Sequence, residues 1–232
     1  MRGLLIIILF VAIAGIAFAQ QADSITKQSK QLLFEDDFHL QVLSNNWLVE
    51  TNEKDAPGYS IVKGQLELNT EGGLTLWFKK ELVGNIIIEY DRTILMDGGK
   101  NDRLSDLNQF WMVTDPQQKM FTRKGGFREY DSLQMYYVGM GGNYNSTTRM
   151  RRYDGKAGLQ IVGEYKDSSH LLQPNKTYHI MIIVKDGWSK FIVDGATFFS
   201  FKDDQPFTKG WFAIRSTKSR QLIDHVKIWQ LN

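Results

Sequence analysis

Short runs of apolar and aromatic residues recur along the chain from Leu32 onward, and Gly, Asn and Asp separate them. The runs follow at intervals of roughly 8 to 15 residues, which is typical of the strands of a β-sandwich or barrel. Helical periodicity is weak, so the pattern predicts an all-β fold. The predicted strands cover residues 32–34, 59–62, 65–69, 74–78, 85–94, 108–113, 134–138, 147–153, 177–185, 188–193, 196–201, 210–216 and 222–229.

Two Asp-Gly pairs, Asp186-Gly187 and Asp194-Gly195, stand between apolar runs. A two-residue hairpin turn needs a positive φ, which Gly adopts without steric hindrance. We therefore expect a three-stranded antiparallel meander over residues 177–201. Two longer segments, 97–106 and 114–131, have little strand character, and loops are expected there.

The 232 residues include 28 Lys and Arg against 26 Asp and Glu, which gives a formal net charge of +2. Duplex nucleic acid needs a clustered basic face, so this balance argues against such a partner. The absence of Cys excludes disulfides, thiolate zinc sites and Cys nucleophiles. The four His residues form no zinc or Ser-His-Asp motif, so no cofactor is expected to be required.

The first 19 residues have the order of a secretory signal peptide: Arg2, an apolar run over 4–14, and the small-residue site Ala17-Phe18-Ala19. A membrane anchor is the alternative, but the apolar run is shorter than the roughly 20 residues that a spanning helix needs. We expect cleavage after residue 19, a flexible leader over 20–31 and a single domain over 32–232. The mature protein is then secreted or periplasmic and has no membrane partner.

The two ends of the mature chain carry a recognisable pair of segments, 34–38 (FEDDF) followed by Trp47, and 222–228 (LIDHVKI). They resemble the ends of the concanavalin A-like, or laminin-G-like, jelly rolls of secreted carbohydrate-active proteins. The resemblance implies a jelly-roll β-sandwich of two antiparallel sheets whose first and last strands pair. It also implies a structural Ca²⁺ held by Asp37 and Asp224, because hard oxygen ligands suit this ion. Plain solvated turn residues are the alternative, since two carboxylates do not specify a site.

Residues 130–153 combine aromatic, amide and guanidinium groups at high density. With a period of two, Arg149, Arg151 and Tyr153 project from one face of a strand and Arg152 projects from the other. Guanidinium groups bind carboxylates bidentately, and Tyr rings offer flat surfaces to sugars. The strand therefore predicts a groove for an acidic glycan.

The loop before this strand holds Asn143, Tyr144 and Asn145, which we expect to contribute to substrate binding. The alternative to a glycan groove is a solvated charged face in which the two arginines pair with neighbouring acids. The candidates for that pairing are Glu129, Asp131 and Asp154.

A second motif lies at residues 106–116. Alternation places Asn108, Phe110 and Met112 on one face, and Gln109, Trp111 and Val113 on the other. Asn108 is expected to hydrogen-bond sugar hydroxyls and Trp111 to stack on a sugar ring. The alternative puts Trp111 in the core and Asn108 at the start of a strand.

Three segments together resemble the YesU-like group of bacterial jelly-roll proteins: 129–131 (EYD), 143–153 (NYNSTTRMRRY) and 191–195 (FIVDG). Genes of this group tend to lie among those for degrading rhamnogalacturonan and related uronate polysaccharides. The resemblance implies extracytoplasmic work on plant or algal glycans. It supplies no catalytic residues to carry over.

The chemistry that these residues favour is lyase-type β-elimination. A lyase needs a cation or amide to neutralise the uronate carboxylate and a base to remove the C5 proton. Arg149 and Arg151, with Asn143 or Asn145, are the candidates for neutralisation. The candidates for the base are Tyr136, Tyr137, Tyr144 and His170.

Three other readings remain open. A glycoside hydrolase needs two carboxyl groups across the scissile bond; Glu129 and Asp131 have a two-residue spacing, and Asp115 and Glu164 are further acids. A non-catalytic glycan-binding module needs only exposed rings and polar groups, and the fold supports it equally. A structural or adhesion role without a sugar site is the third reading.

Overall fold

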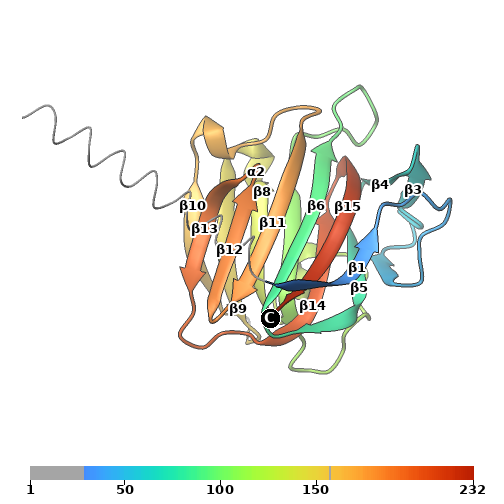
Figure 1. Cartoon of the computed structure of the whole chain (residues 1–232). Coiled ribbons are helices and arrows are strands. Elements are labelled where there is room, and N and C mark those ends of the chain that lie inside the picture. Colours follow the sequence, from blue (N-terminus) through green and yellow to red (C-terminus); the bar gives the residue numbers. More distant parts are fainter. Residues whose placement is uncertain (1–28, 157) are drawn as a thin grey trace, which may run out of the picture.

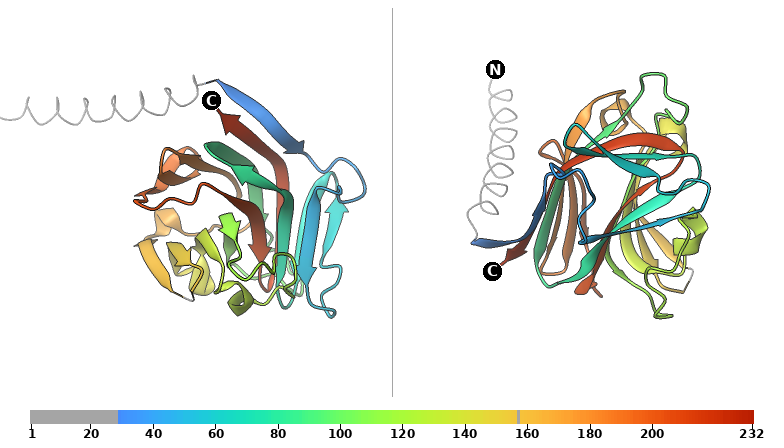
Figure 2. Two further views of the ribbon diagram at one scale, coloured as in Figure 1. Left: turned by 90° about the horizontal axis from the view of Figure 1, so that it is seen from below. Right: turned by 90° about the vertical axis from the view of Figure 1, so that its right-hand side faces the viewer.

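The computed structural model describes residues 29–156 and 158–232; the predicted signal peptide and most of the predicted leader lie outside this range. Two antiparallel sheets lie face to face (Figures 1 and 2). The all-β sandwich that the apolar pattern predicts is confirmed. No helix in the described ranges is long and apolar enough to cross a membrane.

The first sheet contains eight strands. In spatial order they are β13 (Ala196–Lys202), β12 (Trp188–Val193), β11 (Thr177–Lys185), β6 (Ile86–Ile94), β15 (Ser219–Leu231), β4 (Gln65–Thr70) and β3 (Tyr59–Val62), and β1 (Lys30–Asp36) also pairs with β15. The expected meander is present, because β11, β12 and β13 are hydrogen-bonded neighbours. The expected pairing of the first and last strands is present too, with Asp36 opposite Val226. β1 begins at Lys30, two residues inside the predicted leader.

The second sheet contains seven strands. In spatial order they are β10 (Leu159–Tyr165), β9 (Thr147–Asp154), β8 (Gln134–Gly141), β7 (Leu107–Thr114), β14 (Lys209–Ser216), β5 (Leu74–Val83) and β2 (Trp47–Thr51). Two short helical turns, η1 (Phe127–Tyr130) and α2 (Gly142–Asn145), lie in its connections, and a third, η2 (Ser168–His170), lies between β10 and β11 of the first sheet. β2 and β10 are absent from the predicted strands; β2 is a five-residue strand, and β10 is an edge strand whose apolar Leu159 and Ile161 are exposed.

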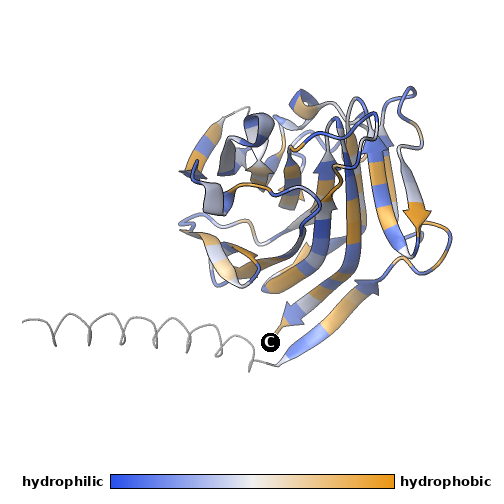
Figure 3. Cartoon of the chain, turned by 90° about the horizontal axis from the view of Figure 1, so that it is seen from above, coloured by the Kyte–Doolittle hydropathy of each residue, from blue (hydrophilic) through white to orange (hydrophobic). Residues whose placement is uncertain are grey.

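Apolar and polar residues alternate along the strands, as the bands in Figure 3 show. The side chains that face the other sheet form the main core, in which Leu66, Ile88, Trp111 and Ile214 are fully buried. Because successive side chains point to opposite faces, this alternation decides which residues of the second sheet remain on its outer face.

A second apolar cluster covers part of that outer face. Trp77 of β5, Phe110 of β7 and Tyr137 of β8 pack there against Tyr130 and Phe127 of η1. The long loop predicted over 114–131 is therefore a cover that lies on the second sheet.

The alternation predicted for β7 is wrong at one point. Met112 has a φ of 51°, and the pairing register shifts between Trp111 and Thr114. This β-bulge sends Met112 into the main core and Val113 to the outer face, opposite to the expectation. Asn108 and Phe110, which precede the bulge, lie on one face as predicted.

Candidate functional site

A pocket of about 320 Å³ opens on the outer face of the second sheet, beside the η1 cover. It lies where β7 begins, β8 ends, β9 begins and β14 ends, so four neighbouring strands contribute to it. Four guanidinium groups line it, those of Arg103, Arg149, Arg151 and Arg215, and Asp106 is its one acidic lining residue in the described ranges. We call it the cationic pocket.

Arg151 projects into the cationic pocket from β9, on the face that the period of two predicts. Its guanidinium lies over the ring of Tyr137 at 5.2 Å and is 3.4 Å from the hydroxyl of Tyr153. Its Nε is buried without a hydrogen-bond partner. Within the described ranges no carboxylate forms an ion pair with Arg151, so its charge is not neutralised.

Arg215 of β14 is a second guanidinium without an ion pair among the described residues, and only 2% of it is exposed. It donates hydrogen bonds to the carbonyl of Gly125, at 2.9 Å, and to the hydroxyl of Thr217. Its guanidinium lies 5.0 Å from the ring of Phe127. Burial lowers the pKa of Arg215, because the charged form loses its hydration.

The other two arginines of the pocket are paired. Arg149 binds Glu164 of β10, with 2.5 Å between Nε and Oε2. Arg103 lies 3.4 Å from Asp106 and also donates to the carbonyl of Thr217 at 2.6 Å. The predicted alternative of a fully paired face therefore holds for Arg149, with a different acid, and not for Arg151.

A hydrogen-bonded chain forms the floor of the pocket. The Tyr137 hydroxyl donates to Asn108 Oδ1 at 2.5 Å, and Asn108 Nδ2 donates to Asp106 Oδ2 at 2.7 Å. Burial, and then the charge of Asp106, raises the pKa of Tyr137 far above its ordinary value, although Arg151 and Arg215 oppose the shift. Tyr137 therefore stays protonated and acts as a hydrogen-bond donor at neutral pH.

Gly139 leaves room for this floor. A Cβ at Gly139 would lie 2.3 Å from the Tyr137 hydroxyl oxygen and 2.9 Å from Asn108 Oδ1. Any side chain at this position would displace Tyr137 or Asn108. The absence of a side chain on this outer-face position of β8 is what keeps the floor together.

The turn α2 forms part of the rim. Asn143 and Tyr144 have left-handed φ values of 52° and 57°, and both line the pocket. Tyr144 is 83% exposed, and the Arg103 guanidinium lies 5.6 Å from its ring. Asn145 is not free to bind a ligand, because its amide exchanges hydrogen bonds of 2.9 and 2.8 Å with the main chain of Leu172.

Three predicted site residues lie away from the cationic pocket. Tyr136 points between the sheets, donates to Asp203 at 2.6 Å and has a pKa that burial raises. Trp111 is fully buried in the main core and donates to Ser189 at 2.9 Å, so it cannot stack on a sugar. His170 stacks on Tyr165 at 3.7 Å and binds Asp167 at 2.7 Å. Tyr136 and His170, two of the predicted candidates for the lyase base, therefore do not line this pocket.

The predicted acid and base alternatives also lie outside this pocket. Burial would raise the pKa of Asp115, but hydrogen bonds and the charge of Arg123, 2.7 Å away, outweigh it and lower the pKa. Glu129 is exposed and accepts a hydrogen bond of 2.6 Å from the Lys124 N–H. Asp131 is half-buried at the end of η1.

Asp37 and Asp224, the predicted calcium ligands, have protein partners. Asp37 contacts His39, and Asp224 accepts hydrogen bonds from Gln65 at 3.1 Å and from the His225 N–H at 2.8 Å. No cluster of three or more His, Asp or Glu side chains suited to a metal ion occurs in residues 29–156 and 158–232. The calcium site stays a prediction.

The sequence interpretation missed Arg103, Asp106 and Arg215. Arg215 carries a signal, because it is a single cation that directly follows the apolar run Trp211–Ile214 in the same strand. A buried charge in a strand needs a specific environment, and this one lies at the floor of the pocket.

The two-sheet fold and the arginine-rich pocket define a jelly-roll β-sandwich with a cationic outer-face pocket. The chain belongs to the family described as domain of unknown function DUF6250, whose model matches residues 68–226. No curated protein matches the chain in sequence.

Solved structures share the fold. A protein of unknown function with a galectin-like fold from Bacillus subtilis is 15% identical, with a TM-score of 0.69 over 87% of this chain and 96% of that one. An endo-β-1,3-glucanase from Pyrococcus furiosus is 10% identical, with a TM-score of 0.64 over 90% and 97%. The carbohydrate-binding module CBM66 from Bacillus subtilis is 14% identical, with a TM-score of 0.57 over 81% and 99%. At these identities the likeness shows the fold alone.

Proposed function

We propose that this protein is an extracytoplasmic carbohydrate-binding protein whose cationic pocket takes an acidic sugar residue, such as a uronate. The observation that carries the proposal is the pair Arg151 and Arg215, two guanidinium groups that converge on one pocket without an ion pair in the described ranges. A carboxylate matches a guanidinium in shape and charge and would neutralise the site. The exposed Tyr144 ring and the Asn143 amide at the rim suit the ring and hydroxyl groups of a sugar.

Two further considerations support a glycan as the ligand. Solved structures of the same fold include a glucanase and a carbohydrate-binding module. The resemblance to the YesU-like group implies rhamnogalacturonan or a related uronate polysaccharide. The signal-peptide pattern at residues 1–19 accords with work outside the cytoplasm.

Binding has more support than cleavage. Hydrolysis needs two carboxyl groups, whereas among the described residues Asp106 is the one lining acid and is already bonded to Asn108 and Arg103. Elimination needs a base, and the raised pKa of Tyr137 makes it a proton donor. β-Elimination is the second candidate because Tyr144, which is exposed and lines the pocket beside Arg103, remains available as a base.

Calorimetric titration with oligogalacturonates tests the binding function. Arg151→Gln should weaken binding about 10- to 100-fold, because a charge-assisted hydrogen-bonded pair contributes roughly 1.5 to 3 kcal/mol. Arg128→Gln, at an exposed arginine of η1 outside the pocket, is the matched control and should bind as the wild type. Affinity should also fall as salt is added.

The same incubations separate binding from cleavage. Ultraviolet absorbance of unsaturated uronate products would identify elimination, and loss of that absorbance in Tyr144→Phe would assign the base. Binding without new absorbance or new reducing ends would identify a non-catalytic protein. Equal affinity of the wild type and Arg151→Gln would rule out the cationic pocket as the glycan site.

A further inference from the structure

A second cavity, of about 840 Å³, lies at the opposite end of the same strands. It is formed where β7 ends, β8 begins and β14 begins, and loop residues 205–208 and 115–120 complete its walls. On β8, Gln134 lines this cavity and Gly139 lines the cationic pocket, so about 17 Å of strand separates the two. The two cavities share no lining residue.

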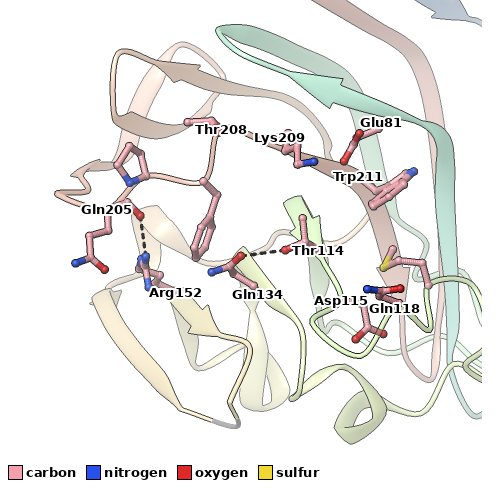
Figure 4. A pocket seen from close by; sticks show the side chains of 13 residues that line it. Glu81, Thr114, Asp115, Gln118, Gln134, Arg152, Gln205, Thr208, Lys209 and Trp211 are labelled. Atoms are coloured by element: carbon pink, nitrogen blue, oxygen red, sulfur yellow. Dashed lines mark hydrogen bonds between the residues drawn. The ribbon is translucent and has the colours of Figure 1, made fainter.

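Three glutamines from separate segments line the second cavity, which we call the amide-lined cavity. Figure 4 shows Gln205 and Arg152 on one side, Trp211 and Gln118 on the other, and Gln134 between them. The Gln118 and Gln205 side chains make no hydrogen bond within the described residues, and Gln134 uses only its oxygen, which accepts from Thr114 at 3.0 Å. The cavity therefore presents amide donors and acceptors that have no partner among the described residues, and Gln118 and Gln205 are exposed to solvent.

The charges of the amide-lined cavity cancel. Arg152 is bonded to Asp203 at 2.7 Å, and Asp115 is bonded to Arg123 at 2.7 Å. Among the described lining residues, Lys209 and Glu81 are the charged groups without an ion pair, one of each sign. This balance distinguishes the cavity from the cationic pocket, where positive charge is in excess.

An aromatic surface completes the lining. The half-buried Trp211 ring is held in place by its N–H, which donates to the carbonyl of Lys79 at 3.1 Å, and by edge contact with Phe121 at 5.7 Å. A fixed ring beside free amides is the lining expected of a small-molecule site, and 840 Å³ falls within the roughly 300 to 1,000 Å³ of such sites.

From these features we propose that the amide-lined cavity is a second binding site, whose ligand is a neutral oligosaccharide. Sugar hydroxyls donate and accept hydrogen bonds, as glutamine amides do, and the apolar face of a sugar ring fits the Trp211 ring. An apolar ligand would leave the amides without partners in a desolvated site. An anionic ligand would gain only Lys209 and would meet Glu81.

The test is calorimetric titration of the full chain with laminarihexaose, cellohexaose and mannohexaose. Gln118→Gly combined with Gln205→Ala removes the two unpaired amides, and Gly suits position 118 because its φ is 56°. At least one neutral hexasaccharide should bind the wild type, and the double variant should bind it about tenfold more weakly, since two neutral hydrogen bonds contribute on the order of 1.4 kcal/mol. Gln117→Ala, at an exposed glutamine outside the cavity, is the matched control.

A crossed comparison separates this proposal from the acidic site. The double variant should keep the wild-type affinity for oligogalacturonate, and Arg151→Gln should keep the wild-type affinity for the neutral sugar. Failure of all three neutral probes to bind, equal binding by the double variant, or loss of neutral binding in Arg151→Gln would each overturn the proposal. If oligogalacturonate does not bind but a neutral hexasaccharide does, only the proposal of an acidic-sugar site in the cationic pocket is overturned.

Discussion

The side chain of Arg92 donates a hydrogen bond of 3.1 Å to the main-chain oxygen of Arg215, whose own guanidinium lies on the opposite face of that strand. Arg92 comes from β6 in the first sheet and also donates to the carbonyl of Asn108 at 2.8 Å. Burial lowers the pKa of Arg92 to about 10, so it stays charged at neutral pH. Positive charge therefore lies on both faces of the second sheet beneath the cationic pocket.

Replacing Arg92 should destabilise the sandwich strongly. Arg92→Met leaves the buried carbonyls of Asn108 and Arg215 and the buried amide oxygens of Gln109 and Gln221 without this donor. We expect the free energy of unfolding to fall by roughly 3 kcal/mol and the Tm by about 6 to 12 °C, measured by calorimetry. Arg128→Met, at an exposed position, should leave the Tm unchanged. A Tm of Arg92→Met equal to that of the wild type would show that water replaces the guanidinium.

The arrangement of Arg92 illustrates what the sequence does and does not predict. Alternation and the Asp-Gly turns predict the strands and the meander because these depend on neighbours in the chain. The same period of two places Arg149 and Arg151 on one face correctly. Arg215 reaches the site because β14 pairs with β7, and Arg92 lies beneath it because β6 of the first sheet packs on the second sheet. No local pattern encodes pairing or packing between segments that are distant in sequence.

The errors have equally local causes. Tyr136 and Tyr137 are adjacent, so only one of them can face the pocket, and the structure selects Tyr137. The bulge at Met112 reverses the alternation of β7, and a positive φ at a methionine has no signal in the sequence. Trp111 is buried, in line with the predicted alternative of a core residue.

A methyl group at Gly139 should close the cationic pocket. In Gly139→Ala the new Cβ would overlap the Tyr137 hydroxyl, which is the donor to Asn108. We expect a loss of about 1 to 3 kcal/mol of stability from overpacking and at least tenfold weaker binding of oligogalacturonate, measured by calorimetry. Gly142→Ala is the matched control within the same pocket lining, because its Cβ would contact neither Tyr137 nor Asn108 and its nearest contact would be an ordinary one, 3.5 Å to Thr147. Undiminished binding by Gly139→Ala would place the ligand away from the Tyr137 floor.

His225 should make stability depend on pH. Its hydrogen bond with Asp91 raises the pKa of His225 above its ordinary value, the charges of Asp224 and Asp91 add to this, and burial and Lys227 oppose it. The charged form is thus favoured in the folded state, so the stabilisation is complete below the ordinary pKa of 6.5 and is lost as the pH rises through the folded value.

The variant His225→Asn tests this dependence, and Asn tolerates the φ of 51° at this position. The Tm difference between the wild type and His225→Asn should be largest near about pH 5.5 and should shrink toward about pH 8.5. In an Asp91→Asn background the same comparison should lose most of its pH dependence. A Tm difference that grows with pH would contradict the assignment.

Glu50 should hold the η1 cover on the second sheet. Its carboxylate is buried and accepts three hydrogen bonds, from Trp77 Nε1 at 2.8 Å, from the Tyr130 hydroxyl at 2.9 Å and from the Arg123 N–H at 2.7 Å. In Glu50→Gln the amide NH₂ must face one of these donors, so at least one hydrogen bond is lost in a buried site. We expect the free energy of unfolding to fall by roughly 1 to 3 kcal/mol. We also expect faster proteolysis within residues 115–133, measured by limited digestion with trypsin, which cleaves after Lys119, Arg123 and Lys124. Glu53→Gln, at an exposed neighbouring position, should be cleaved as fast as the wild type.

Residues of the cover line both cavities, so release of the cover in Glu50→Gln should weaken the binding of acidic and of neutral oligosaccharides together. The variants within one pocket should each weaken the binding of one of these ligands.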